Sequence, residues 1–313
     1  MERTSSRPAP SWVRLAASVV KRLPAGRYRA IHGLCRRPPS PFLMRMPGEM
    51  GGHVYLCDLR DAIAREVCFT GMYGPQETAI FRALLRPGMT FVDVGANWGY
   101  FSLLASHLVG EGGRVVSLEP DPRLFPVLSE NVARNRIGNA SLHQLAAARE
   151  RGDLSLAGFD EEAGNFGISR IVADGSGERV FTVRADTLDR VLEEAGVGSV
   201  DLLKMDIEGA EAAALAGLGR SLRERRVRRL LIELHPAELA EQGTSAGEVV
   251  EALRSAGYVG YTVSHDPRVT REAAYGRIRD LGAILRPLSP GAPLDAWPHQ
   301  LWLAPGTEPE WSR

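Results

Sequence analysis

The fold is decided by the stretch Phe91-Val-Asp-Val-Gly-Ala-Asn-Trp-Gly99, in which an apolar run leads into a turn rich in glycine. The run over residues 90–94 predicts a buried strand, and apolar residues at helical spacing predict a helix that begins near Tyr100. A second apolar run, residues 114–118, predicts the next strand, and Glu119 follows it directly. This strand–helix–strand order is typical of a doubly wound parallel sheet, in which ligands bind at the carboxyl ends of the strands.

The glycine turn indicates the kind of ligand. Glycine lets a backbone pass close to a ligand, and the start of the helix offers free N–H groups. Asn97 stands where the dinucleotide fingerprint has its second glycine, which disfavours a nicotinamide cofactor. Asp93 suits an ammonium group better than a phosphate, and Glu119 can accept hydrogen bonds from both hydroxyls of a ribose. The turn, followed by Glu-Pro, therefore resembles the S-adenosylmethionine (SAM) motif of class I methyltransferases.

Length and composition limit the class of protein. The 313 residues are enough for one large domain, with or without appendages. Lys and Arg number 38, as do Asp and Glu, so the formal charge of zero predicts neither a nucleic-acid partner nor electrostatic attachment to a membrane. Cys35, Cys57 and Cys68 lack the spacing of metal ligands and are typical of free thiols in a reducing compartment. No apolar run approaches the roughly 20 residues that span a bilayer, so we expect a cytoplasmic protein without a transmembrane segment.

Residues 1–75 are predicted to form an amino-terminal extension, or cap. Residues 1–10 are rich in Pro, Ser and Arg and are predicted to be disordered. A predicted helix follows, and one of its faces carries Trp12, Leu15, Ala16, Val19 and Leu23. We expect this apolar face to pack against the chain's own domain. Two alternatives stay open: the helix docks a second copy of the chain in a homo-oligomer, or it lies on a membrane.

Residues 76–313 are predicted to form the main domain. Beyond the first two strands, further strands are predicted over residues 139–145, 200–205, 229–234, 259–264 and 299–303. The fold class is therefore α/β, with a doubly wound and mostly parallel sheet of seven strands. The long connection over residues 265–298 is predicted to be a substrate loop, and a disordered surface excursion is the alternative. The residues available there for an acceptor pocket are Ser264, His265, Asp266 and Tyr275.

Ionisable residues interrupt two of the predicted strands. Lys204 and Asp206 share one face of the segment LLKMD, although a central parallel strand is expected to be apolar on both faces. Glu233 and His235 do the same in the segment LIELH. If the strands are neighbours, the four groups meet beside the ligand site, and buried ionisable groups must be paired or shifted in pKa. A purely structural ion pair between Lys204 and Glu233 is the alternative for those two residues.

Six segments together carry a family resemblance: VDVGANWGYFS, SLEPDP, LSENVARN, TLD, LLKMDIEGAE and IELHP. In combination they resemble the FkbM-type methyltransferase family over roughly residues 70–240. The resemblance implies a SAM-dependent enzyme that methylates a hydroxyl of a small molecule such as a sugar, a glycoside, a polyketide or another secondary metabolite. It implies nothing about the segments on either side.

The resemblance also implies which residues hold SAM: Asp93, Gly95, Asn97, Gly99, Tyr100, Glu119, Ala146 and Asp206. Residues of the glycine turn would line the methionine part, Glu119 would hold the ribose, and the backbone near Ala146 would meet the adenine. One departure is the apolar segment Leu145-Ala146-Ala147, where many class I enzymes carry an acidic residue near the adenine amine. Adenine recognition is therefore expected from backbone groups or from another loop.

The candidate catalytic residues are His235, Asp206, Lys204 and Glu208. By the resemblance, Asp206 and Glu208 would face the reacting methyl group. Full deprotonation of an alcohol as weakly acidic as water would cost about 12 kcal/mol at pH 7, so a base must accept the proton as the new bond forms. His235 is the expected base because an unperturbed imidazole has a pKa of about 6.5. Asp206 would orient this imidazole or accept the proton itself.

Three other hypotheses stay open. Mg²⁺ held by Asp206 with Glu233 or His235 would bind a substrate diol, although the sequence offers no evident third oxygen ligand. The chain would otherwise be a SAM-binding scaffold without turnover, paired through its amino-terminal helix. A nicotinamide-dependent reductase is the third hypothesis, and Asn97 counts against it. The expected partner of the favoured enzyme is a small-molecule hydroxyl acceptor and not a nucleic acid.

Overall fold

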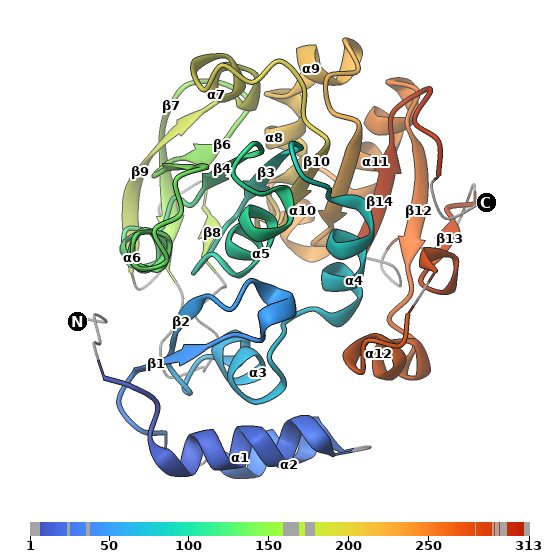
Figure 1. The fold of residues 1–313 in the computed structure, drawn as a ribbon. Coiled ribbons are helices and arrows are strands. Elements are labelled where there is room, and N and C mark those ends of the chain that lie inside the picture. Colours follow the sequence, from blue (N-terminus) through green and yellow to red (C-terminus); the bar gives the residue numbers. More distant parts are fainter. Residues whose placement is uncertain are drawn as a thin grey trace.

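A computed structural model describes residues 7–23, 26–35, 38–158, 169–172, 179–278, 280–289, 291, 294 and 299–309. A mixed sheet of eight strands forms its centre (Figure 1). In spatial order the strands are β13 (Leu285–Pro287), β12 (Val259–Val263), β14 (His299–Leu303), β11 (Arg229–Glu233), β10 (Leu202–Met205), β3 (Thr90–Val94), β4 (Arg114–Leu118) and β5 (Ala140–His143). The strands from β5 to β11 are parallel, while β14 runs antiparallel to both β11 and β12.

All seven predicted strands occur in this sheet, and the predicted α/β fold is confirmed. The eighth strand, β13, was not predicted because its three residues show no apolar pattern; it pairs antiparallel with β12. This strand lies within the connection over residues 265–298, which also contains α12 (Pro267–Ala274). The described part of that connection is therefore ordered, and the alternative of a disordered excursion is wrong for these residues.

Helices cover both faces of the sheet, because successive residues of each strand point to opposite faces. On one face, side chains such as Phe91 and Val115 belong to the same hydrophobic cluster as α4 and α5. On the other face, Val92 and Val116 pack in a cluster with α7, α8 and α11. The helices of the main domain are α4 (Pro75–Leu84), α5 (Tyr100–Val109), α6 (Phe125–Arg134), α7 (Leu188–Glu194), α8 (Glu211–Ala216), α9 (Gly219–Arg223), α10 (Pro236–Glu241), α11 (Ala246–Ser255) and the short η2 (Leu281–Ala283).

The chain leaves the main sheet after β5 and forms a second sheet of four strands. In spatial order these are β6 (Ala146–Ala147), β9 (Val180–Asp186), β7 (Gly152–Ala157) and β8 (Arg170–Ile171). Ala146, one of the predicted SAM contacts, thus begins a short strand that pairs with Ala185 of β9. The second sheet places apolar side chains beside the carboxyl ends of the main strands.

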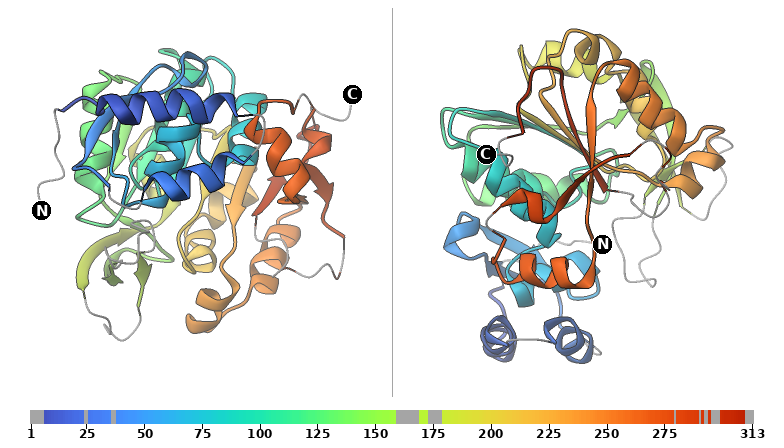
Figure 2. Two further views of the ribbon diagram at one scale, coloured as in Figure 1. Left: turned by 90° about the horizontal axis from the view of Figure 1, so that it is seen from below. Right: turned by 90° about the vertical axis from the view of Figure 1, so that its right-hand side faces the viewer.

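An amino-terminal layer precedes the main sheet. Its elements are α1 (Ser11–Arg22), α2 (Arg27–Leu34), β1 (Phe42–Arg45), η1 (Gly48–Met50), β2 (Val54–Cys57) and α3 (Ala62–Thr70). Their buried side chains join the cluster that contains α4 and α5, and α1 and α2 lie side by side at the base of the molecule (Figure 1, Figure 2). Residues 1–6 lie outside the described residues, but the N–H of Ala9 donates to the carbonyl of Leu43 at 3.0 Å. The predicted disorder therefore does not extend to residues 7–10, whereas a domain boundary after residue 75 stays a prediction.

The orientation of α1 differs from the prediction. The side chains that α1 buries are Val13, Ala17 and Val20. Trp12, Leu15 and Val19, on the predicted inward face, are 44%, 69% and 51% exposed. The expectation that this face packs on the chain's own domain is therefore wrong for these three side chains, whereas Ala16 and Leu23 of the same predicted face do pack against the core; the smaller side chains let α1 approach α3. None of the described helices is long and apolar enough to cross a membrane.

Candidate active site

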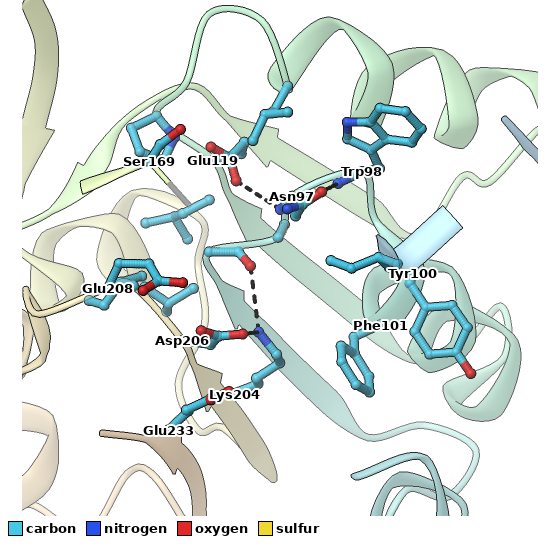
Figure 3. A pocket seen from close by; sticks show the side chains of 18 of the residues that line it. Asn97, Trp98, Tyr100, Phe101, Glu119, Ser169, Lys204, Asp206, Glu208 and Glu233 are labelled. Carbon is cyan, nitrogen blue, oxygen red and sulfur yellow. Dashed lines mark hydrogen bonds and ion pairs between the residues drawn. The ribbon is translucent and has the colours of Figure 1, made fainter. Parts of the chain in front are cut away.

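A cavity of about 290 Å³ lies at the carboxyl ends of β3, β4 and β10 (Figure 3). Four segments form half of its wall, residues 94–98, 118–120, 145–147 and 206–208, and the amino-terminal layer and the segment before α4 add Tyr55, Ala62, Ile63, Glu66 and Tyr73. The second sheet adds Leu156, Ser169 and Ile171, and the start of α5 adds Tyr100 and Phe101. The cavity therefore lies at the sheet edge where the sequence predicts a SAM site.

Glu119 is a fixed, buried acceptor on the wall of this cavity. It is 4% exposed, and its Oε2 accepts the N–H of Asn97 at 2.8 Å, while Oε1 accepts the N–H of Asp121 at 2.9 Å. Burial raises the pKa of Glu119 to about 7, although the two N–H bonds act to lower it. Each carboxylate oxygen keeps further acceptor capacity. Two neighbouring hydroxyls, as on a ribose, match this arrangement.

The glycine turn is held in a backbone conformation that few residues adopt. Gly95, Asn97 and Gly99 have φ values of 81°, 52° and 89°. A Cβ on Gly95 would lie 2.0 Å from the carbonyl oxygen of Asp206, and one on Gly99 would lie 2.6 Å from Cδ1 of Leu128. Both glycines are therefore required by the packing of the turn on the β10 loop and on α6, and not only by the approach of a ligand.

Six of the predicted SAM contacts line the cavity: Gly95, Asn97, Tyr100, Glu119, Ala146 and Asp206. Asp93 and Gly99 do not. Asp93 is 1% exposed, and its Oδ2 accepts the hydroxyl hydrogen of Ser102 at 2.6 Å. It shares the strand face of Phe91, which points towards α5. The expectation that Asp93 lines the site is therefore wrong, because the strand turns its side chain beneath the wall.

Lys204 links three segments below the cavity. Its Nζ donates to Asp206 Oδ2 at 3.3 Å and to the carbonyl of Gly95 at 3.5 Å, and lies 3.8 Å from Asp93 Oδ1 (Figure 3). Burial would lower the pKa of Lys204, but the carboxylates of Asp206 and Asp93 hold it above its usual value. Glu233 is instead paired with His299, at 2.9 Å between Oε2 and Nε2. The alternative of a Lys204–Glu233 pair is therefore wrong: Lys204 pairs across β3 and β10.

His235 does not line the cavity. Its Nδ1 lies 2.7 Å from Glu211 Oε1, and its Nε2 lies 3.4 Å from Glu208 Oε2 and 3.9 Å from Asp206 Oδ1. Burial alone would lower the pKa of His235, but the hydrogen bond to Glu211 and the nearby carboxylates raise it to about 9. An imidazole that is already protonated at pH 7 accepts no further proton. The geometry therefore contradicts the expectation that His235 is the general base.

Two carboxylates complete this corner of the site. Glu208 lines the cavity with φ of 48°, a strained conformation for a residue other than glycine, and burial raises its pKa to about 7. Glu211 is fully buried and was not predicted, although it ends the same segment, LLKMDIEGAE. A carboxylate at the first position of an otherwise apolar helix is the signal that could have found it.

Asp206 faces the cavity as a carboxylate, because Lys204 and His235 hold its pKa below the usual value against the effect of burial.

A second cavity, of about 340 Å³, adjoins the first. The two cavities share six wall residues: Glu66, Tyr73, Phe101, Lys204, Asp206 and Glu233. The rest of the second wall comes from Tyr28 of α2, residues 74–77 at the start of α4, and His265, Thr270 and His299 near the carboxyl end of the chain. It therefore combines segments that are far apart in the sequence.

The predicted substrate loop contributes only in part. His265 lines the second cavity, but Ser264 and Asp266 line a separate hollow beside Arg286. Tyr275 packs against Arg27, with the guanidinium carbon 3.8 Å from the ring centre, and donates its hydroxyl to the carbonyl of Leu23 at 2.7 Å. Of the four predicted residues, only His265 lines the second cavity.

Two groups of described side chains have the donor atoms to hold a cation. One is Asp206, Glu208 and His235, and the other is Glu77, His265 and His299; within each group the donor atoms lie within 4.8 Å of one another. The first group contains the pair predicted for Mg²⁺. Glu208 adds a third donor atom, a carboxylate oxygen, which is not evident from the sequence pattern.

The first cavity fits SAM by the chemistry of its wall. Glu119 offers carboxylate oxygens at one position, and Leu145, Ala146 and Ile171 offer an apolar surface for a flat base. Asp206 and the backbone of Gly95 lie at the opposite part of the wall, where a charged amino-acid portion would meet a carboxylate. The absence of an acidic residue at Leu145-Ala146-Ala147 leaves the adenine amine to backbone groups or to Ser169.

Comparison with known proteins gives the chain a family. A family model described as the methyltransferase FkbM domain matches residues 93–259. The 31-O-demethyl-FK506 methyltransferase FkbM of Streptomyces tacrolimicus is 30% identical over 202 residues, which are 56% of this chain and 74% of that protein. The hexuronic acid methyltransferase AglP of Haloferax volcanii is 27% identical over 143 residues, which are 46% of this chain and 54% of that protein.

Solved structures were also compared. The methyltransferase FkbM from Methylobacillus flagellatus KT is 15% identical, with 88% of this chain and 58% of that chain covered and a TM-score of 0.41. The chain thus spans about three quarters of the first relative, but little more than half of the second relative and of this structure.

Proposed function

Because the chain belongs to the FkbM family of SAM-dependent methyltransferases, we propose that it methylates a hydroxyl of a small molecule held in the second cavity. One observation carries this proposal. Lys204, Asp206 and Glu233 line both cavities, so a methyl donor in the first and an acceptor in the second would meet at these residues. One relative is named for an O-demethyl compound and another for a hexuronic acid, which favours an oxygen acceptor.

SAM supplies an electrophilic methyl group on a sulfonium when it is bound. Glu119 accepts the ribose hydroxyls, and Leu145, Ala146 and Ile171 flank the adenine. The turn at Gly95 and Asn97 positions the amino-acid portion. Alignment of the two reactants supplies most of the acceleration in such a displacement, up to about 7–11 kcal/mol. The packing that fixes the turn on β10 is therefore part of the catalytic machinery.

Asp206 takes the role of proton acceptor in this mechanism. It faces the junction of the two cavities as a carboxylate, whereas His235 is protonated and turned towards Glu211. As the new C–O bond forms, the hydroxyl becomes a strongly acidic oxonium, so even a carboxylate of low pKa accepts its proton. Lys204 and the His235 imidazolium position Asp206 and balance its charge before that transfer.

The first test measures the binding of S-adenosylhomocysteine (SAH) by calorimetry, with NADH in parallel. We expect micromolar binding of SAH alone, followed by methyl transfer to a hydroxyl acceptor in a panel of sugars and polyketides. Tight binding of NADH without SAH would contradict the proposal. Binding of SAH without transfer to any hydroxyl or amine would favour the non-catalytic scaffold.

Replacement of Asp206 tests the assigned role. In Asp206→Asn we expect kcat to fall about 10²- to 10⁴-fold, the usual contribution of a general base, and the affinity for SAH, which Asp206 also contacts in this proposal, to fall much less than kcat. Asp153→Asn, at an exposed position of β7, is the control and is expected to keep wild-type kcat. If Asp206→Asn turned over at the wild-type rate, another group would have to accept the proton of the hydroxyl.

A Mg²⁺-dependent reaction is the second candidate, because Asp206, Glu208 and His235 bring three donor atoms within 4.8 Å. In that case an excess of chelator is expected to abolish turnover, and Mg²⁺ to restore it. Full activity in the presence of chelator would contradict the Mg²⁺-dependent reaction and support the metal-free mechanism.

A further inference from the structure

The second cavity contains a cluster of imidazoles and carboxylates that the methyl-transfer mechanism does not use. Glu77 lies in the first turn of α4, His265 directly follows β12, and His299 begins β14. Glu77 Oε1 lies 3.1 Å from His265 Nε2 and 3.7 Å from His299 Nε2. Glu233, the last residue of β11, lies 2.9 Å from His299 Nε2. Four elements of the fold thus converge on one point.

The spacing of these atoms suits a transition metal. Donor atoms around a tetrahedral zinc ion, with bonds of about 2.0–2.1 Å, lie about 3.4 Å apart. Those of Glu77, His265 and His299 already lie within 4.8 Å of one another, so small rotations of the side chains would close the shell. Two imidazoles and a carboxylate are a donor set that zinc and iron(II) accept and that Mg²⁺ seldom takes.

The surroundings of His265 strengthen this interpretation. Its Nδ1 lies 3.2 Å from the carbonyl of Val263, which is the contact that commonly orients a metal-bound imidazole. Donation from Nδ1–H to this carbonyl leaves a lone pair on Nε2, the atom that faces Glu77. Glu77 itself is only 7% exposed, and its carboxylate lies in the wall of the cavity.

We propose that Glu77, His265 and His299 bind a divalent transition metal, with zinc as the best match, in the acceptor cavity. Glu233 or an oxygen of the acceptor would complete the shell. Because the site lines the second cavity and not the first, the metal would bind the acceptor and not SAM. Its consequence for the acceptor rests on the proposed function: a hydroxyl or carboxylate oxygen on the metal would be held in place, and a bound hydroxyl would be more acidic.

Metal binding by the full chain tests the proposal without any turnover. The protein is stripped with chelator, desalted and titrated with ZnCl₂ alone in a calorimeter. We expect micromolar or tighter binding, and its loss in His265→Ala and in Glu77→Gln. Glu208→Gln, in the other donor cluster, is the matched control and is expected to keep the wild-type affinity. Thermal unfolding of each variant establishes that it is folded.

Three results would overturn the assignment: no binding by the wild-type protein, unchanged binding by His265→Ala, or a loss of binding in Glu208→Gln alone. A parallel titration with SAH separates this test from that of the proposed function. A protein that binds SAH but not zinc keeps the first proposal and loses the second. A protein that binds zinc but not SAH keeps the zinc site and loses the proposed function.

A second inference rests on a different observation, the distribution of charge along the chain. Residues 3–48 contain ten Lys and Arg and no Asp or Glu, whereas the whole chain has 38 of each kind. The formal charge of zero therefore conceals a basic amino-terminal segment and an acidic remainder. A total charge of zero therefore does not argue against electrostatic attachment of this segment to a membrane.

The exposed face of α1 is both apolar and basic. Trp12, Leu15 and Val19 are 44%, 69% and 51% exposed. Arg14 and Arg22 flank them, and their side-chain hydrogen bonds go to the hydroxyls of Ser11 and Ser18 and not to acidic groups. The helix lies at the base of the molecule, with its other face packed inward (Figure 1, Figure 2). Aromatic and aliphatic side chains with flanking arginines are typical of a helix that lies in a lipid interface.

We infer that α1 attaches the protein to an anionic lipid surface. The charge selects this partner over a second copy of the chain, because two copies joined through α1 would bring two basic faces together. Negatively charged headgroups would instead neutralise the arginines, while Trp12, Leu15 and Val19 enter the boundary with the acyl chains.

Co-sedimentation with vesicles tests the inference. We expect the full chain to bind vesicles of equal parts phosphatidylglycerol and phosphatidylcholine, to bind pure phosphatidylcholine weakly, and to be released by salt. Leu15→Ser is expected to weaken binding about tenfold or more, because the lost apolar contact is that of a whole side chain. Val259→Ser, at another exposed apolar position, is the control. No preference for anionic vesicles, or a dimer in solution that Leu15→Ser dissociates, would overturn the inference.

Discussion

At the scale of single residues, the site depends on charges that neutralise one another in the protein interior. Lys204 is 6% exposed and stands between Asp93 and Asp206, on two neighbouring strands. Removal of one partner from such a buried group leaves an uncompensated charge, which typically costs about 3–5 kcal/mol. Lys204 therefore holds Asp206 at the junction of the cavities and fixes the carbonyl of Gly95. In the proposed mechanism, Lys204 would thus be a positioning residue for the groups that touch the reactants.

Glu119 carries a prediction at this scale. Burial raises its pKa to about 7 from the usual 4.5 of a glutamate, so between these values the folded protein binds more protons than the unfolded chain. The free energy of unfolding is then expected to fall as the pH rises through this window, and Glu119→Gln is expected to remove that part of the slope. Denaturant titrations of both proteins from pH 4 to pH 8 measure it. Equal slopes in the two proteins would contradict the assignment.

The same residue predicts how binding of SAH depends on pH. A carboxylate accepts ribose hydroxyls more strongly than the protonated acid, so affinity is expected to rise as the pH passes about 7. Glu119→Gln is expected to bind about tenfold more weakly, because a charged hydrogen bond contributes about 1.5–3 kcal/mol. Its affinity is expected to depend less on pH than that of the wild-type protein, and calorimetry at several pH values checks both expectations.

At the scale of elements, the glycine turn joins two neighbouring strands by close backbone contact. The turn follows β3, and Gly95 meets the carbonyl of Asp206 directly after β10. The loop that presents Asp206 and the turn that lines the first cavity thus form one rigid unit at the sheet edge. Any movement of one loop would displace the other.

Gly95→Ala tests this unit. An added Cβ would lie 2.0 Å from the carbonyl oxygen of Asp206, at a φ of 81° that disfavours alanine. We expect a loss of at least about 1–3 kcal/mol in the free energy of unfolding, and a marked loss of SAH affinity. Gly138→Ala is the control, since no atom lies within 4 Å of its added Cβ and its φ is not positive. Equal effects of the two substitutions in denaturant titration would contradict the expectation.

For the molecule as a whole, the second cavity, which we propose to hold the acceptor, is built from both ends of the chain. Tyr28 and Glu66 come from the amino-terminal layer, and His265, Thr270 and His299 come from the carboxyl-terminal part. The family model matches residues 93–259. Tyr28 and Glu66 precede this segment, and His265, Thr270 and His299 follow it. The family match thus covers most of the wall of the first cavity, except Tyr55, Ala62, Ile63, Glu66 and Tyr73, and leaves most of the wall of the second cavity outside it. Acceptor choice is therefore expected to depend on residues that the family resemblance does not describe.

Tyr28→Ala tests this separation of roles. The hydroxyl of Tyr28 donates to Glu66 Oε1 at 2.9 Å on the wall of the second cavity, and Tyr28 does not line the first. We expect KM for the acceptor to rise several-fold while SAH affinity stays unchanged. Leu15→Ser, in the same amino-terminal layer but away from both cavities, is expected to change neither in the absence of lipid. A loss of SAH affinity in Tyr28→Ala would contradict the division.

The α/β fold, the seven strands and the sheet edge at which the first cavity lies follow from the sequence alone, because apolar periodicity and the glycine turn are local patterns. It also identified Glu119 and Asp206, since a carboxylate at a strand end has a predictable place in a parallel sheet. Only the tertiary structure decided that Asp93 lies beneath the wall, that Lys204 pairs with Asp93 and Asp206, and that His235 is held as a cation by Glu211. The position of Asp93 and the partners of Lys204 and His235 depend on which strands become neighbours and on how many charged groups share one buried region. Neither is a local property of the sequence. The same reason applies to the acceptor cavity: Tyr28, Glu77, His265 and His299 show no common pattern along the chain, and only folding brings them together.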